Sequence, residues 1–283
     1  MTTKFTDDLE RAVFLPFCGE FGHLILQHVR YVHGHRAGRK VVLCEKGQEC
    51  LFPTADSFRY DWVNPIPDRE RCSAGAIRDV SNDAYATYDE VLRRRLEKEY
   101  PDHEVIRPGR RGAPGYDWNA AESNKFLPSA AARLPIVDIA LAPRWRMFEV
   151  VRNNTHYPHI VKSLRAMGIT VGLVGAAETS VQCAADTRAW DHPDGATAGT
   201  VDLLSRCILY VGTDSGVSHL AGLMDIPTLL FRKTYPGNTD LTGAVRRANR
   251  AWCKILGDSA WEDPEEILYE ILLFLHAWEI KQY

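Results

Sequence analysis

Residues 210–228 read YVGTDSGVSHLAGLMDIPT, and this stretch decides the fold class. An apolar run from Ile208 to Val211 stops at the polar turn 212–216, and a helical pattern follows. Pro227 ends that pattern before a second apolar run at 228–231. The order strand, tight turn, helix, strand is typical of parallel strands joined by right-handed helical crossovers.

The polar turn has the chemistry of an anion site. Ligands of an open parallel sheet bind outside the carboxyl ends of its strands, where this turn lies. The helix that begins near Ser215 presents unpaired N–H groups and a positive dipole end, which suit a phosphate. Gly216 allows close approach to the backbone, and Ser215 can donate its hydroxyl proton. Asp214 would hold the turn, orient His219 or bind a sugar hydroxyl; alternatively, the segment is only a capped, buried helix.

The whole chain repeats this alternation in two halves. At about 100–200 residues per domain, a chain of 283 residues favours two domains. A stretch rich in Gly, Pro, Ala and Arg separates the halves, and its later part reads as a linker. We therefore expect two doubly wound, Rossmann-like α/β domains over residues 1–133 and 134–262, and an apolar final helix over 263–283.

Composition excludes several classes of protein. The net charge is −3 and the pI about 6.4, so no global field would attract nucleic acid or an anionic membrane. No apolar stretch reaches the roughly 18 residues of a spanning helix, and the acidic start does not look like a signal peptide. We expect a cytoplasmic protein with no integral membrane segment and no metal site. The oligomeric state is left open.

The second half resembles glycosyltransferase family 9, the lipopolysaccharide heptosyltransferases. VGTDSGVSHLAGLMDIPTLLF looks like that family's nucleotide-sugar site, and the similarity covers about residues 136–240, with its motifs in the family's order. The resemblance implies a GT-B fold, with two Rossmann-like domains facing across a cleft and the nucleotide held by the second. It also implies that the helix 263–283 packs back on the first domain.

Donor-binding residues follow from the resemblance by position. Asp214, Ser215, Gly216 and His219 match the diphosphate turn, and Arg152 falls where a basic residue meets the phosphates. Because Asn154 replaces the family's tryptophan, the register near Arg152 is uncertain, and two other arginines are reserve candidates. The loop 175–178 matches the loop whose carboxylate accepts from the ribose hydroxyls. The residues added by these two arguments are Arg144, Arg146, Gly175 and Glu178.

The catalytic base is expected in the first half, after the strand 12–17. PFCGEFGHLILQ resembles the family's first loop, in which an aspartate deprotonates the acceptor hydroxyl. Here His23 occupies that position, with Glu20 three residues earlier. A histidine with a pKa near 6.5 is a competent base at neutral pH. Glu20 could instead be the base or orient His23; alternatively, both residues only begin a helix.

A basic loop in the first half is a candidate acceptor site. Arg107, Arg110 and Arg111 lie in a Gly/Pro-rich segment and could bind an anionic acceptor, or could be solvated surface charges. Aromatic residues follow close behind, so a glycan and a nucleic acid are both compatible with this loop.

These features predict a metal-independent, inverting glycosyltransferase. It would use a nucleotide-diphosphate sugar as donor substrate, with no cofactor, and a glycan or lipid-linked saccharide as acceptor. The alternatives are a glycosyltransferase acting on a hydroxymethylated DNA base and a non-catalytic nucleotide-sugar-binding GT-B module. The sequence names neither the base and sugar of the donor nor the acceptor.

Overall fold

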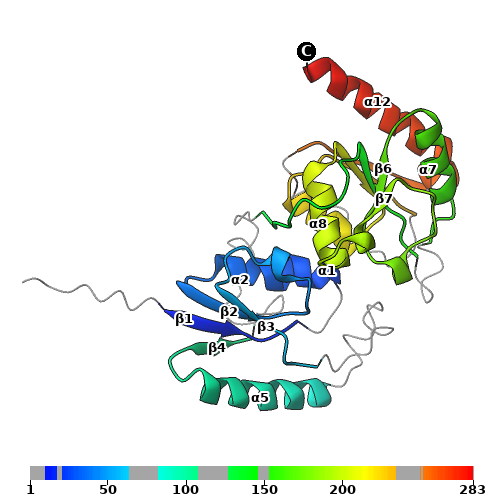
Figure 1. The fold of residues 1–283 in the computed structure, drawn as a ribbon. Coiled ribbons are helices and arrows are strands. Elements are labelled where there is room, and N and C mark those ends of the chain that lie inside the picture. The colour runs from blue at the N-terminus through cyan, green and yellow to red at the C-terminus, as the bar shows by residue number, and fades with distance from the viewer. Residues whose placement is uncertain are drawn as a thin grey trace, which may run out of the picture. The chain divides into compact units, whose positions relative to one another are not determined.

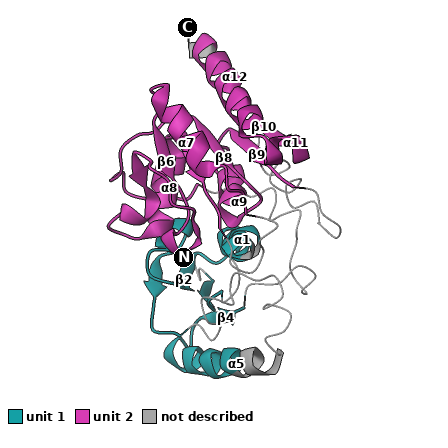
Figure 2. Ribbon diagram, turned by 90° about the vertical axis from the view of Figure 1, so that its right-hand side faces the viewer, with its two compact units in different colours: residues 1–124 teal, residues 125–283 magenta. Residues whose placement is uncertain are grey.

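The computed structural model describes residues 10–17, 21–63, 82–107, 127–145, 153–233, 249 and 251–282. The chain forms two compact units, residues 1–124 and residues 125–283 (Figure 2). Each unit contains its own parallel sheet (Figure 1). The expected doubly wound α/β architecture is therefore present in both halves.

The first unit is a four-stranded sheet in the order β3-β2-β1-β4. Every described strand pair in it is parallel. The strands are β1 (Arg11–Phe14), β2 (Arg39–Leu43), β3 (Ser57–Arg59) and β4 (Glu104–Ile106). The helical segments are α1 (Phe21–His23), the π-helix η1 (Leu24–Val29), α2 (Arg30–Gly34), the 3-10 turn η2 (Glu49–Leu51) and α5 (Asn82–Glu99).

Helices cover both faces of this sheet (Figure 1). Side chains alternate across a strand, so Val13 faces the opposite way from Phe14. Val13 packs in a buried cluster with Leu92 and Leu96 of α5. Phe14 makes an edge-to-face contact with Tyr31 of α2, with ring centroids 6.4 Å apart. The strand expected at 12–17 is thus present as β1, which ends at Phe14 and is buried on both faces.

The second unit is a six-stranded sheet in the order β10-β9-β8-β5-β6-β7, with parallel pairing. The strands are β5 (Ile139–Ala142), β6 (Val171–Leu173), β7 (Thr187–Arg188), β8 (Leu209–Gly212), β9 (Thr228–Phe231) and β10 (Cys253–Leu256). The helical segments are α7 (Tyr157–Ala166), the 3-10 turns η4 (Ala177–Thr179) and η5 (Ala189–Asp191), α8 (Ala196–Arg206), α9 (Gly216–Leu223), α11 (Asp258–Glu262) and α12 (Pro264–Gln282).

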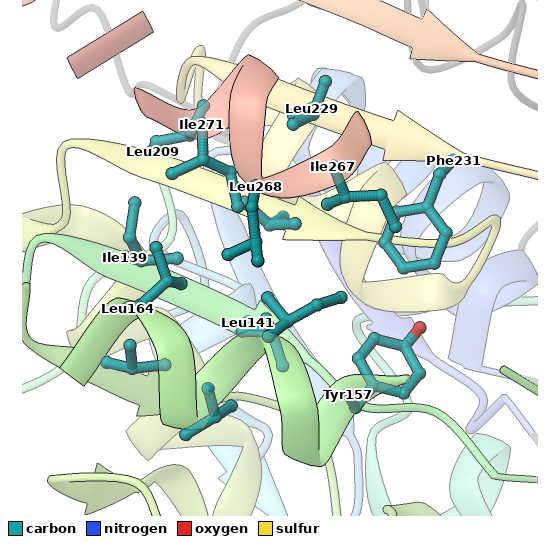
Figure 3. Close-up of a cluster of buried hydrophobic side chains, with 14 of the residues drawn as sticks. Ile139, Leu141, Tyr157, Leu164, Leu209, Leu229, Phe231, Ile267, Leu268 and Ile271 are labelled. Carbon is teal, nitrogen blue, oxygen red and sulfur yellow. The ribbon is translucent and has the colours of Figure 1, made fainter. Parts of the chain in front are cut away.

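One face of this sheet forms the larger hydrophobic core (Figure 3). Alternate residues of the central strands, such as Leu141 and Leu209, pack there against α7 and the first half of α12. Tyr157 begins α7 and lies fully buried beside Phe231, with ring centroids 5.7 Å apart. Tyr210, between Leu209 and Val211, points to the opposite face by strand alternation.

The last helix packs against the core of the second unit through its first half. Ile267, Leu268 and Ile271 of α12 are buried in the core of that unit (Figure 3). Further along the helix, Leu273 and Ile280 are 47% and 63% exposed. The expected packing of this helix on the first unit stays a prediction.

A buried carboxylate ties the segment before β5 to α8. Asp202 is 1% exposed and accepts hydrogen bonds from the backbone N–H groups of Arg133 and Leu134, at 2.9 Å each. The guanidinium of Arg206, one turn further along α8, donates to the same carboxylate through Nε at 2.8 Å. This side chain therefore fixes the end of the segment that was expected to link the domains.

Candidate functional site

The strand order of the second unit brings two loops together at one point. From β5 the chain proceeds to β6 and β7 on one side, and then returns to place β8, β9 and β10 on the other. The order therefore reverses between β5 and β8, whose last residues Ala142 and Gly212 are paired. In open α/β sheets this reversal point, at the carboxyl ends of the strands, is where ligands bind.

The turn after β8 is held by reciprocal serine hydrogen bonds. Ser215 is the N-cap of α9, and its Oγ accepts from the backbone N–H of Ser218 at 3.3 Å. Ser218 Oγ in turn accepts from the backbone N–H of Ser215 at 2.9 Å. Gly216 and Val217 occupy the first helical positions, where a helix has no internal acceptor for its N–H groups. The turn therefore presents backbone N–H donors at the positive end of a helix dipole, held in place by the two serines.

Arg144 brings a positive charge to this turn. It follows β5, and its Nη1 donates to the backbone carbonyl oxygen of Asp214. The two residues are 70 positions apart but lie on either side of the reversal point. The guanidinium is partly buried, so its charge is only partly screened by water. Arg144 was a reserve candidate from the sequence, and the structure places it against the turn.

Asp214 and His219 lie side by side. His219 Nε2 is 3.7 Å from Asp214 Oδ1, and His219 is only 4% exposed. The backbone N–H of His219 donates to Ser215 O at 3.3 Å, which keeps the imidazole in the first turn of α9. A carboxylate beside a histidine fixes the orientation of the ring.

The loop after β6 completes this edge of the sheet. Gly175 has φ +111°, a conformation that side chains disfavour, and its N–H donates to Thr200 Oγ1 at 3.1 Å. Glu178 lies in the exposed 3-10 turn that follows. The N–H of Trp145 donates to Thr179 O at 2.8 Å, so this turn is bound to the segment that carries Arg144. The exposed carboxylate is thus held beside the same strand ends.

The first unit has a reversal point of its own, between β1 and β4. Leu15 N, just after β1, donates to Ile106 O of β4 at 2.9 Å. Arg107 follows β4, and its Nε is 2.8 Å from the carboxylate of Asp89, which is 6% exposed. The guanidinium is therefore engaged by α5 of its own unit. His23 ends α1, which follows β1.

Several predicted site residues lie outside the described residues. These are Glu20, Arg110, Arg111, Arg146 and Arg152, together with the side chain of His23.

Sequence reasoning missed the capping role of Ser218 and named Arg144 only as a reserve candidate. Ser218 is three residues after Ser215, and a hydroxyl residue at each end of this spacing is a capping signal that was readable. The approach of Arg144 to the turn was not readable, because it depends on β5 and β8 becoming neighbours.

Comparison with known proteins identifies the domain that carries the turn. Residues 151–259 match the family model of glycosyltransferase family 9 (heptosyltransferase). The match includes the turn after β8 and covers less than half of the chain. The resemblance found in the sequence is therefore confirmed, and the chain is a glycosyltransferase. No curated sequence matches the chain.

Solved structures show the same fold. E. coli ADP-heptose LPS heptosyltransferase II superposes with a TM-score of 0.58 at 13% identity, covering 95% of this chain and 99% of its own. A glycosyl transferase family 9 protein from Veillonella parvula gives a TM-score of 0.52 at 12% identity, covering 88% and 87%. At these identities the likeness establishes the fold alone, and the prediction of two Rossmann-like domains in a GT-B fold is confirmed.

Two searches of the described part of the chain were negative. Among residues with described positions, no three His, Cys, Asp or Glu side chains gather in a group that could hold a metal ion. No described helix has both the length and the apolarity to cross a membrane.

Proposed function

We propose that the protein transfers a sugar from a nucleotide-diphosphate sugar to a hydroxyl group of a glycan or lipid-linked saccharide. The observation that carries this proposal is the turn at the reversal point of the second sheet. There, the N-terminus of α9, the cap Ser215 and the guanidinium of Arg144 converge. Such a set of donors with positive charge suits a diphosphate.

An ADP-sugar is the donor that we favour. The solved relative with the higher TM-score is named for ADP-heptose. In this chain the ribose would lie at Glu178, whose two carboxylate oxygens can accept from a diol. The diphosphate would then cross the end of β5, past Arg144, to the turn after β8. Neighbouring strands are about 4.8 Å apart, so this path spans about 10 Å, which suits the distance from a ribose to a β-phosphate.

The proposed reaction is a single displacement at the anomeric carbon. A base in the first unit, His23 or Glu20, takes the proton of the acceptor hydroxyl, and the oxygen attacks the anomeric carbon as its bond to the diphosphate breaks. The departing nucleoside diphosphate gains negative charge, which Arg144 and the N–H groups of α9 stabilise. Arg152 is a further candidate for this role from its position in the family motif. In this proposal protein groups supply all of the positive charge, and the configuration at the anomeric carbon is inverted.

The acceptor is proposed to meet the first unit near the ends of β1 and β4. Arg107, Arg110 and Arg111 follow β4 in the sequence and would contact anionic groups of a saccharide. Because Arg107 already engages Asp89, its contribution would be the smallest of the three.

The test is release of ADP from ADP-heptose, with and without a saccharide acceptor. A glycosyltransferase releases ADP faster when the acceptor is present. Mass spectrometry then finds the heptose on the acceptor, and NMR of the product shows that the anomeric configuration is inverted. A binding module would retain affinity for ADP-heptose yet release no ADP under either condition, which would refute the proposal.

A further inference from the structure

A buried tyrosine lies directly beneath the donor turn. Tyr210, in the middle of β8, is fully buried, and its hydroxyl oxygen is 3.5 Å from Ser215 Oγ. Gly212 makes this approach possible, because a Cβ at that position would lie 2.5 Å from the tyrosine hydroxyl. The glycine that ends β8 therefore has a steric purpose, which is to leave room for a hydroxyl that reaches the N-cap of α9.

The hydrogen bonds at Ser215 Oγ determine where its own proton can go. A serine hydroxyl has two acceptor positions and one donor. One acceptor position receives the backbone N–H of Ser218. Burial raises the pKa of Tyr210 above its ordinary value of 10.0, so this phenol is protonated at neutral pH and able to donate. If Tyr210 fills the second acceptor position, the proton of Ser215 is left to donate to a ligand.

We infer that Tyr210 is a positioning residue that directs the Ser215 hydroxyl toward the β-phosphate of the donor. This inference rests on the proposed function, and it adds the phosphate that the hydroxyl selects. With the ribose at Glu178 after β6, the α-phosphate lies nearer β5 and the β-phosphate reaches the turn after β8. Tyr210 thus favours nucleoside diphosphates over monophosphates without touching either.

Tyr157 provides a matched control on the other face of the sheet. It is also a fully buried tyrosine, and its hydroxyl lies near Thr213 and the backbone of Arg144 rather than near Ser215. Replacing either tyrosine by Phe keeps the ring and removes one buried oxygen. The two variants therefore remove the same group from the same unit, and only one of them removes a contact with Ser215.

The experiment measures the dissociation constants of ADP and AMP by calorimetry. The proteins are the wild type, Tyr210→Phe, Tyr157→Phe, Ser215→Ala and the double variant of Tyr210 and Ser215, each checked by thermal melting. Loss of one oriented hydrogen bond should lower the preference for ADP over AMP by about three- to tenfold in Tyr210→Phe. Ser215→Ala should lower it similarly, the double variant no further, and Tyr157→Phe should keep it.

Three outcomes would overturn the inference. If Tyr210→Phe keeps the full preference for ADP while Ser215→Ala loses it, the role of the tyrosine is refuted. The proposed donor site is then unaffected. An equal loss in Tyr157→Phe would show that removing any buried hydroxyl near the turn has this effect, and would refute a specific role for the contact between Tyr210 and Ser215. A wild-type protein that binds ADP no better than AMP would refute the proposed donor site together with the inference.

Discussion

A buried histidine should make the first unit sensitive to acid. His28 lies in the π-helical segment η1 and is 2% exposed, between the rings of Phe17 and Phe52, each 5.8 Å away. Its Nε2 has no hydrogen-bond partner among the described residues. Burial alone lowers the pKa of His28 from 6.5 to about 3. The imidazole is therefore neutral in the folded unit and takes up a proton when the chain unfolds.

The direction and size of the effect follow from this difference in pKa. Above pH 6.5, His28 is neutral in both states and its contribution is constant. As the pH falls below 6.5, the unfolded state gains a proton that the folded state does not bind, and the free energy of unfolding decreases. At about 1.4 kcal/mol per pH unit, the loss is about 2 kcal/mol at pH 5, and it continues until the pH reaches the folded pKa.

The assay is equilibrium urea unfolding at pH 7.5 and at pH 5. Hydrogen exchange of residues 11–14 and 39–43 reports the first unit separately from the second. His28→Met replaces the imidazole by an apolar side chain that does not titrate, and should remove about 2 kcal/mol of the pH difference. His276→Met, at an exposed histidine of α12, should leave the pH difference of the first unit unchanged. Equal pH differences in the wild type and His28→Met would refute the reasoning.

Three further predictions concern the charge of Arg144, the catalytic base and the buried carboxylate of Asp202. Arg144→Met should weaken ADP binding about tenfold or more in calorimetry, because a charge-assisted contact is lost, whereas Arg165→Met on α7 should bind normally. His23→Ala should lower turnover by about 10²–10⁴ with donor affinity nearly unchanged, and the same loss from Glu20→Gln alone would move the base to that residue. Asp202→Ala leaves buried donors unpaired and should lower the stability of the second unit by about 3 kcal/mol in urea, and unchanged stability would contradict this.

The central elements of the fold were predictable because their patterns are local. The apolar run before the polar turn is β8, and the turn itself provides the N-cap of α9. The run after Pro227 is β9. The apolar stripe of the last helix was also found, and Ile267 and Ile271 are buried. Such features depend on spacing within about ten residues, which the sequence displays directly.

The edges of the sheets and the contacts across them were not predictable. β7 has only two residues, and three of the four residues of β10 are partly exposed, so neither shows a strong apolar run. The contact between Arg144 and the turn joins residues 70 positions apart. The meeting of Tyr210 and Ser215 depends on the turn geometry after Gly212, which a pattern of apolar and polar residues does not specify.

The most direct test of the account is calorimetric titration of ADP into the wild type, Gly216→Val and Gly257→Val, with circular dichroism to show that each protein is folded. Gly216 lies at the start of α9, where a side chain would enter the phosphate space, whereas a Cβ added at Gly257 meets nothing within 4 Å. The account predicts binding to the wild type and Gly257→Val, and at least about tenfold weaker binding to Gly216→Val, a loss of about 1.4 kcal/mol. Wild-type affinity in a folded Gly216→Val protein would contradict the placement of the diphosphate at this turn.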